Sequence, residues 1–198
     1  ITVVGIDAAF ANMGFVKVEV DPNTRKVAKL LDLKVVSTEK DSSKGVLVSA
    51  DRLRRGRVLL QEMRAFCYGA SISIAEAPEG SQSAQAAFSL GIATGLLCAS
   101  PLPLVEVTPR DVKAVLGKKG ATKEEMRQWA YGLFPDAPWL SYRGKRTNDN
   151  EHAADALAAV FAGVQKELFK AYAGLYSPAE LLAYPYSEEE RPRRRLVR

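Results

Sequence analysis

The first part of the chain carries apolar and polar residues in the patterns of β-strands. An apolar run over residues 1–7 ends in Asp7, which is typical of a buried central strand. Residues 14–20 alternate apolar and charged side chains, residues 21–24 are turn formers, and residues 27–37 continue as an antiparallel partner strand. We therefore expect three strands in a meander at the start of the fold.

Strand and helix patterns alternate in the rest of the chain. Strands are expected over residues 71–75 and 102–107, and helices over residues 49–68, 83–99, 109–116, 122–133 and from 148 onward. A meander followed by such alternation predicts an α/β fold, with a mixed five-stranded sheet and helices on both of its faces. One domain over residues 1–184 and a charged C-terminal tail over residues 185–198 are expected.

Several helix ends carry recognisable caps. Ser49-Ala50-Asp51 is a candidate N-cap for the helix that Gly69 ends, and Thr122 with Glu125 has the spacing of a capping box. Asn148 and Glu151 have the same spacing, so capping is the expected role of Glu151, in preference to that of an outer ligand or charge neighbour.

Composition and charge narrow the possible settings. The net charge is +5, hydrophobic residues make up 47%, and no apolar stretch approaches the ~20 residues that span a bilayer. Cys67 and Cys98 fall in apolar helical patterns, which predicts small buried hydrophobes and a reducing, cytoplasmic setting.

Basic residues are unevenly distributed. Five arginines lie in the tail, and four more open a helix at Arg52, Arg54, Arg55 and Arg57. Such clusters are typical of proteins that bind polyanions, and equally of a solvated surface.

Four side chains are candidates for a metal site. Asp7 and Glu76 each end an apolar strand, and the carboxyl ends of strands are where α/β sheets bind ligands. His152, the only histidine, and Asp155 share one face of the last long helix. Together they suit one or two divalent cations. Each also has an ordinary alternative: Asp7 could accept backbone hydrogen bonds, Glu76 could pair with an arginine, and His152 and Asp155 could form a cap pair.

The last helix is suited to lie close to the sheet. Ala156, Ala159 and Gly163 follow His152 on the same narrow face, and small side chains permit close approach. The positive end of the helix dipole is expected to disfavour protonation of His152 and to leave the ring available as a neutral ligand.

These motifs resemble a known family. The chain resembles the RuvC-type Holliday-junction resolvases of the ribonuclease H-like superfamily in the following segments, which occur in the family's order: Gly5-Ile6-Asp7, Ala75-Glu76, residues 90–95, residues 108–113, Gly117, Lys123 and residues 152–158. The resemblance implies a ribonuclease H-like fold and a metal-binding catalytic set of Asp7, Glu76, His152 and Asp155. It also implies that Lys113 and Lys123 lie near the scissile phosphate and the DNA backbone.

Two departures distinguish the chain from the family pattern. Ala8-Ala9 stands where Pro-Gly usually follows Gly-Ile-Asp, and Glu79 stands where an aromatic residue usually wedges into the junction. Junction recognition is therefore expected to differ, as in a divergent, phage-type member.

The resemblance implies a structure-selective endodeoxyribonuclease of DNA recombination and repair. It would nick four-way and other branched DNA in pairs, as a homodimer, with Mg²⁺ or Mn²⁺ at a two-metal site. Two alternatives stay open: a non-catalytic junction-binding module, and a less selective ribonuclease H-like nuclease that acts on flaps or RNA–DNA hybrids. An ASKHA-type phosphotransferase is disfavoured, because the chain shows no convincing glycine-rich phosphate loop and no second half-domain.

Overall fold

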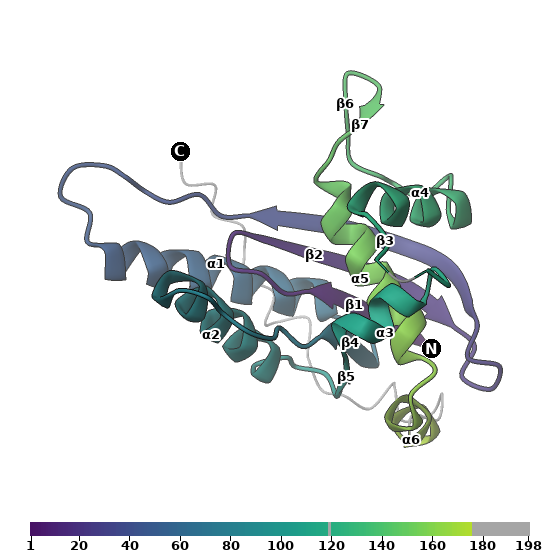
Figure 1. Cartoon of the computed structure of the whole chain (residues 1–198). Helices are drawn as coiled ribbons and strands as arrows, with labels where there is room; N and C mark the ends of the chain where they lie inside the picture. Colours follow the sequence, from purple (N-terminus) through teal and green to yellow (C-terminus); the bar gives the residue numbers. More distant parts are fainter. Residues whose placement is uncertain (119, 176–198) are drawn as a thin grey trace.

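A mixed five-stranded sheet forms the centre of the molecule (Figure 1). The structure is a computed structural model that describes residues 1–118 and 120–175. The strands are β1 (Thr2–Asp7), β2 (Asn12–Val20), β3 (Val27–Ser37), β4 (Ile72–Glu76) and β5 (Leu104–Val107). Their order is β3-β2-β1-β4-β5; β1, β2 and β3 form the antiparallel meander, and β4 and β5 run parallel to β1. The predicted α/β class and five-stranded mixed sheet are confirmed.

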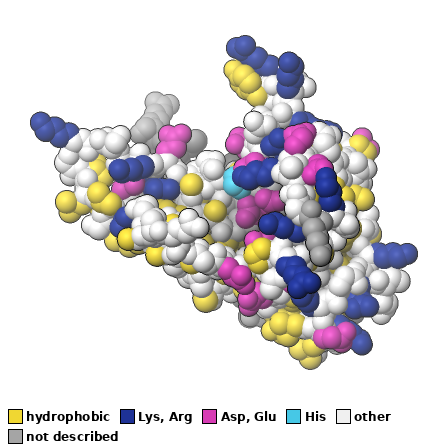
Figure 2. Space-filling model, viewed as in Figure 1, with side chains coloured by type: hydrophobic (Ala, Val, Ile, Leu, Met, Phe, Trp, Pro, Cys, Tyr) yellow, Lys and Arg dark blue, Asp and Glu magenta, His cyan; other side chains and the backbone are white. Residues whose placement is uncertain are grey.

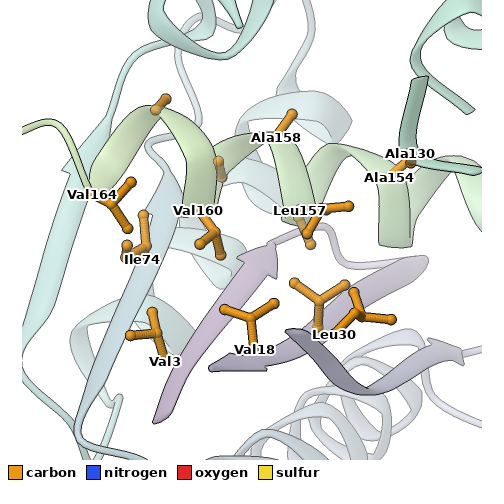
Figure 3. Close-up of a cluster of buried hydrophobic side chains, with 14 of the residues drawn as sticks. Val3, Val18, Leu30, Ile74, Ala130, Ala154, Leu157, Ala158, Val160 and Val164 are labelled. Atoms are coloured by element: carbon orange, nitrogen blue, oxygen red, sulfur yellow. The ribbon is translucent and has the colours of Figure 1, made fainter. Parts of the chain in front are cut away.

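Helices cover both faces of the sheet. On one face, α1 (Val48–Cys67) and α2 (Ala84–Cys98) pack on alternate residues of β1 that include Val4 and Ile6. The other face carries α3 (Pro109–Ala114), α4 (Lys123–Leu133), α5 (Asn150–Gly163) and α6 (Glu167–Leu175). In Figure 3, Leu157 and Val160 of α5, with Val164 just after the helix, lie over Val3, Val18 and Ile74 of the sheet. Because strand side chains alternate between faces, β1 contributes to both hydrophobic layers.

Local capping explains several helix starts. Thr108 with Asp111, and Thr122 with Glu125, form complete capping boxes, as the Thr122 spacing predicted. The predicted Ser49–Asp51 cap of α1 is wrong. The N-cap is Leu47, which makes no side-chain bond, and Asp51 instead lies buried inside the helix, where it accepts hydrogen bonds from Arg54.

Two elements were not expected from the sequence. A short hairpin of β6 (Ser141–Tyr142) and β7 (Lys145–Arg146) projects from the body between α4 and α5 (Figure 1). The helix α6 follows α5 after a short turn. The predicted tail, residues 185–198, lies outside the described residues, as does the end of the predicted domain.

The arginines at the start of α1 are largely engaged within the protein. Arg52 lies over the Phe88 ring, and Arg55 lies over the Phe10 ring and donates to Thr38 Oγ1 at 3.1 Å. Together with the Arg54–Asp51 pair, these contacts favour a structural role for most of this cluster.

The two cysteines differ in their surroundings. Cys67 is buried as predicted, and burial raises the pKa of its thiol to about 11. Cys98, the last residue of α2, is exposed, so the prediction for that residue is wrong. No helix in the described part of the chain is long and apolar enough to cross a membrane.

Candidate functional site

Asp7 and Glu76 lie beside each other at one end of the sheet. The parallel register of β1 and β4 pairs Ile6 with Ala75, so the next residue of each strand, Asp7 and Glu76, ends its strand at the same edge. Because both strands finish there, their carboxylates point to the region outside the sheet where α/β folds bind ligands.

The helix α5 reaches this edge because two glycines let it approach the sheet. A Cβ on Gly5 would stand 2.3 Å from the carbonyl oxygen of Ala156, and one on Gly14 would stand 2.2 Å from that of His152. Neither position has room for a side chain, since real Cβ contacts of this kind are essentially never below 3.0 Å. The close approach predicted from the small residues of α5 thus also requires glycine on the strands.

His152 contacts Asp7 directly. Its Nδ1 lies 2.8 Å from Asp7 Oδ2, and the two side chains are 18% and 26% exposed, so the pair is open to solvent on one side. The hydrogen bond to Asp7 raises the pKa of His152, and burial opposes that shift only in part. This shift is opposite in direction to the one expected from the helix dipole, because the adjacent carboxylate favours the protonated ring.

Glu76 and Asp155 experience a concentrated negative potential. Burial, followed by the charges of Asp7 and Asp155, raises the pKa of Glu76 to about 7. Burial, followed by the charge of Asp7, raises the pKa of Asp155 to about 6. The three carboxylates are thus electrostatically coupled, and a bound cation would offset their mutual repulsion.

The two candidate lysines interact with different carboxylates of this site. The charge of Lys113 lowers the pKa of Glu76, which places this lysine of α3 near the carboxylates. Lys123, at the start of α4, donates to Glu151 Oε1 at 2.8 Å, and this hydrogen bond raises the pKa of Lys123. Asp155 and Asp7 add to the shift, so Lys123 also faces the site.

Glu151 has a different role from the one its spacing predicted. The capping-box prediction for Asn148 and Glu151 is wrong, because α5 begins at Asn150 and its N-cap, Asp149, makes no side-chain bond. Glu151 instead pairs with Lys123 and lies 3.7 Å from Arg127 and 3.8 Å from His152 Nε2. It therefore ties α4 to α5 beside the histidine, a role that depends on the packing of two helices and has no local sequence signal.

Asn150 is a further residue that the sequence did not single out. It is fully buried, and its amide exchanges hydrogen bonds of 2.9 Å with the backbone N–H and C=O of Leu140 while also donating to Thr147 O. These bonds hold the segment before α5 against the helix start. An asparagine just before the Glu-His pair was the one available signal.

The side chains of Asp7, Glu76, His152 and Asp155 are of the types that bind divalent cations, although they are not arranged around a common point in this structure. No group of three or more His, Cys, Asp and Glu side chains among the described residues is arranged to hold a metal ion. Three coupled carboxylates and an imidazole are nevertheless ligands that Mn²⁺ and Mg²⁺ accept in proteins. Figure 2 shows the histidine (cyan) at the surface, beside acidic and basic side chains.

The fold of the chain is similar to that of several solved structures. RuvC of T. thermophilus in complex with a Holliday junction substrate is 23% identical, with 81% of this chain and 91% of that chain covered and a TM-score of 0.57. The Thermus thermophilus RuvC structure is 24% identical, with 82% of this chain and 92% of that chain covered and a TM-score of 0.53. Fowlpox virus resolvase, in complex with its substrate Holliday junction DNA, is 12% identical, with 83% of this chain and 97% of that chain covered and a TM-score of 0.54.

These likenesses identify the fold class of the chain. The five-stranded mixed sheet with helices on both faces is a ribonuclease H-like fold. Within that class, the chain has the fold of RuvC and of the poxvirus Holliday junction resolvase over most of its length. No protein-family model matches the chain, and no curated protein matches its sequence.

Proposed function

We propose that this protein is a structure-selective endodeoxyribonuclease that resolves Holliday junctions and other branched DNA by metal-dependent phosphodiester hydrolysis. The observation that carries the proposal is the position of Asp7, Glu76, His152 and Asp155 at one edge of a RuvC-like sheet, where each carboxylate influences another. The solved neighbours with the same fold include resolvases bound to junction DNA.

In this proposal the four side chains hold divalent cations. Two such cations would supply an activated water and charge stabilisation for the leaving oxygen. Asp7 and Glu76 present carboxylates from the sheet, while His152 and Asp155 present their donors from α5. His152 must release the proton that it shares with Asp7 before its Nδ1 can serve as a ligand.

The lysines would act on the phosphate. Lys113 is exposed and near Glu76, so its ammonium is available to a phosphodiester that approaches the carboxylates. Lys123 would contact the DNA backbone in addition to its pair with Glu151, which joins α4 to α5. Neither lysine needs to form a covalent bond with the substrate.

Paired nicks require two active sites, which a homodimer provides. The substrate has two-fold symmetry, and a symmetric dimer matches it. The helix α2 favours this arrangement, because it contains no charged residue and exposes small side chains that include Ala87, Gly91 and Gly95. A second copy of the same helix could pack closely on this face.

Substitution of Asp7 tests the site. We expect Asp7→Asn to retain binding to a synthetic four-way junction and to abolish its cleavage, because binding depends on basic groups and cleavage on the carboxylate. Asp136→Asn removes an exposed carboxylate outside the site and is the matched control. Wild-type cleavage by Asp7→Asn would remove the assignment.

The metal dependence tests the role of His152. We expect Mn²⁺ to support cleavage at least as well as Mg²⁺, because imidazole is a poor ligand for the harder Mg²⁺. A strict preference for Mg²⁺ would contradict direct ligation by His152.

A panel of substrates separates this function from its alternatives. Labelled junction, flap, duplex and RNA–DNA hybrid are each incubated with and without Mn²⁺. Preferential cleavage of the junction is expected. Equal cleavage of flaps or hybrids would indicate a less selective nuclease, and binding without cleavage would indicate a junction-binding module.

A further inference from the structure

The hairpin of β6 and β7 carries basic side chains away from the body of the protein. It consists of two two-residue strands joined by Arg143 and Gly144, with Tyr142 paired to Lys145 across the ladder. Tyr142 is 66% exposed, and the Arg143 guanidinium lies 5.2 Å from the centre of its ring. Figure 2 shows basic and hydrophobic side chains grouped at the projection that Figure 1 labels β6 and β7.

The cations at the tip differ from those at the base. Lys118 pairs with Glu125, Lys123 with Glu151, and Arg127 with Glu124, so each of these three basic side chains of the body has an acidic partner. Within residues 1–118 and 120–175, neither Arg143 nor Lys145 has an ion pair. Two unneutralised charges on a projecting element are available to an external polyanion.

The turn itself holds an arginine in an unfavourable conformation. Arg143 has φ of 50° and Gly144 has φ of 75°, as a two-residue type I′ hairpin turn requires. Asparagine is the favoured residue before glycine in such a turn, and a long side chain in the left-handed region costs about 1 kcal/mol or more. The presence of arginine where asparagine would be more stable points to a use for its charge.

The base of the hairpin is fixed to the candidate site. Arg146 donates to Pro135 O at 2.9 Å and lies 4.3 Å from the centre of the Tyr131 ring, which anchors β7 to the end of α4. Asn150 ties Leu140 and Thr147 to the first residue of α5, two residues before His152. A two-stranded hairpin is marginally stable alone, so these anchors set its position relative to His152.

We propose that the β6–β7 hairpin is a second DNA contact, in which Arg143 and Lys145 bind phosphates of a duplex arm and Tyr142 stacks on a base exposed at the branch point. This inference rests on the proposed action on branched DNA. Exposed cations beside an exposed aromatic ring suit DNA, because phosphates attract the charges and an unpaired base offers a face for stacking. The anchors then hold that arm at a fixed position relative to the carboxylates.

The test uses the full chain with Arg143→Asn and Lys145→Gln combined. Asparagine is favoured in the turn, so the variant is expected to be at least as stable as the wild type while it loses two charges. Binding to a labelled four-way junction is measured without divalent metal over a range of salt concentrations. The variant loses two phosphate contacts per protomer, four in the proposed homodimer. This loss lowers the slope of log K against log salt by about 3.6, and weakens binding at 0.1 M salt roughly tenfold or more.

A matched control removes the same charge elsewhere. Lys26→Gln with Lys29→Gln changes two exposed lysines at or next to the start of β3. Lys29 lies opposite Glu19 in the strand register, and Glu19 lies opposite Thr2, so these lysines are at the other end of β1 from Asp7. This control is expected to keep the wild-type salt slope. Equal slopes for the hairpin variant and the control would overturn the proposed phosphate contacts.

Tyr142→Ala tests the aromatic contact separately. The variant should lose most of its preference for the junction over linear duplex while keeping the wild-type salt slope, and Tyr142→Phe should restore the preference because stacking does not need the hydroxyl. An unchanged preference in Tyr142→Ala would refute the stacking role. If the wild type itself shows no preference for branched DNA, the proposed function fails; if it does and the hairpin variants match it, only the hairpin proposal fails.

Discussion

Gly14→Ala is the sharpest test of how the fold positions the site. Gly14 lies on β2 beneath the first turn of α5, and an added Cβ would stand 2.2 Å from His152 O and 2.4 Å from His152 C. Ordinary contact begins at 3.4 Å, so the helix start must move by about 1.2 Å (3.4 minus 2.2). Both contacted atoms belong to the backbone, so a change of side-chain rotamer cannot relieve the clash.

The expected result has a stability component and an activity component. Overpacking of this kind costs roughly 1–3 kcal/mol in the free energy of unfolding, measured by urea denaturation. A catalytic group displaced by about 1 Å can lose roughly a hundredfold in rate, so junction cleavage should fall by more than the loss of folded protein explains.

Gly132→Ala is the matched control for this substitution. Gly132 lies in α4, and an added Cβ would meet no atom within 4 Å. Alanine is a better helix former than glycine, so this variant should gain up to about 1 kcal/mol and keep its cleavage rate. Wild-type stability of Gly14→Ala would refute the close-packing argument, and reduced stability with unchanged cleavage would refute the dependence on the position of His152.

Three further predictions follow from the charges and surfaces of the structure. The pKa of Glu76 is raised from its ordinary value of 4.5 to about 7 in the folded protein, so the metal-free stability of the wild type should fall as pH rises from about 4.5 to 7. Glu76→Gln should weaken that fall and gain on the order of 1–3 kcal/mol at pH 8 in EDTA, measured by thermal and urea unfolding. A steeper fall would contradict the repulsion. Lys166, which donates to Asp111 at 2.8 Å, and the Thr108 cap lower the pKa of Asp111 to about 2. This carboxylate therefore stabilises the fold above about pH 4 and ceases to do so as pH falls through 2. Asp111→Asn should cost about 1 kcal/mol in urea unfolding at pH 7, because the partly exposed pair is screened by solvent, and should cost nothing below pH 2. Gly91→Arg places a charge on the exposed face of α2, where an added Cβ meets no atom within 4 Å. This variant should sediment as a folded monomer, while the control Gly132→Arg should remain a dimer. A dimeric Gly91→Arg variant would exclude this face as the dimer contact.

Features encoded by neighbouring residues were readable directly from the chain. The strand predicted over residues 27–37 matches β3, and the helix predicted from Thr122 matches α4, because alternation and capping act over a few residues. The ends of β1 and β4 likewise placed Asp7 and Glu76, since parallel strands finish at a common edge. Their assignment as metal ligands stays a prediction.

Other features depend on contacts between segments that are distant in sequence. The exclusion of a Cβ from Gly14 arises from His152, and the role of Glu151 arises from Lys123 on another helix. The β6–β7 hairpin was missed because its strands are too short to show a period. The raised pKa of His152 has the same origin, because folding brings Asp7 Oδ2 to 2.8 Å from its Nδ1 although the two residues lie 145 positions apart in the sequence.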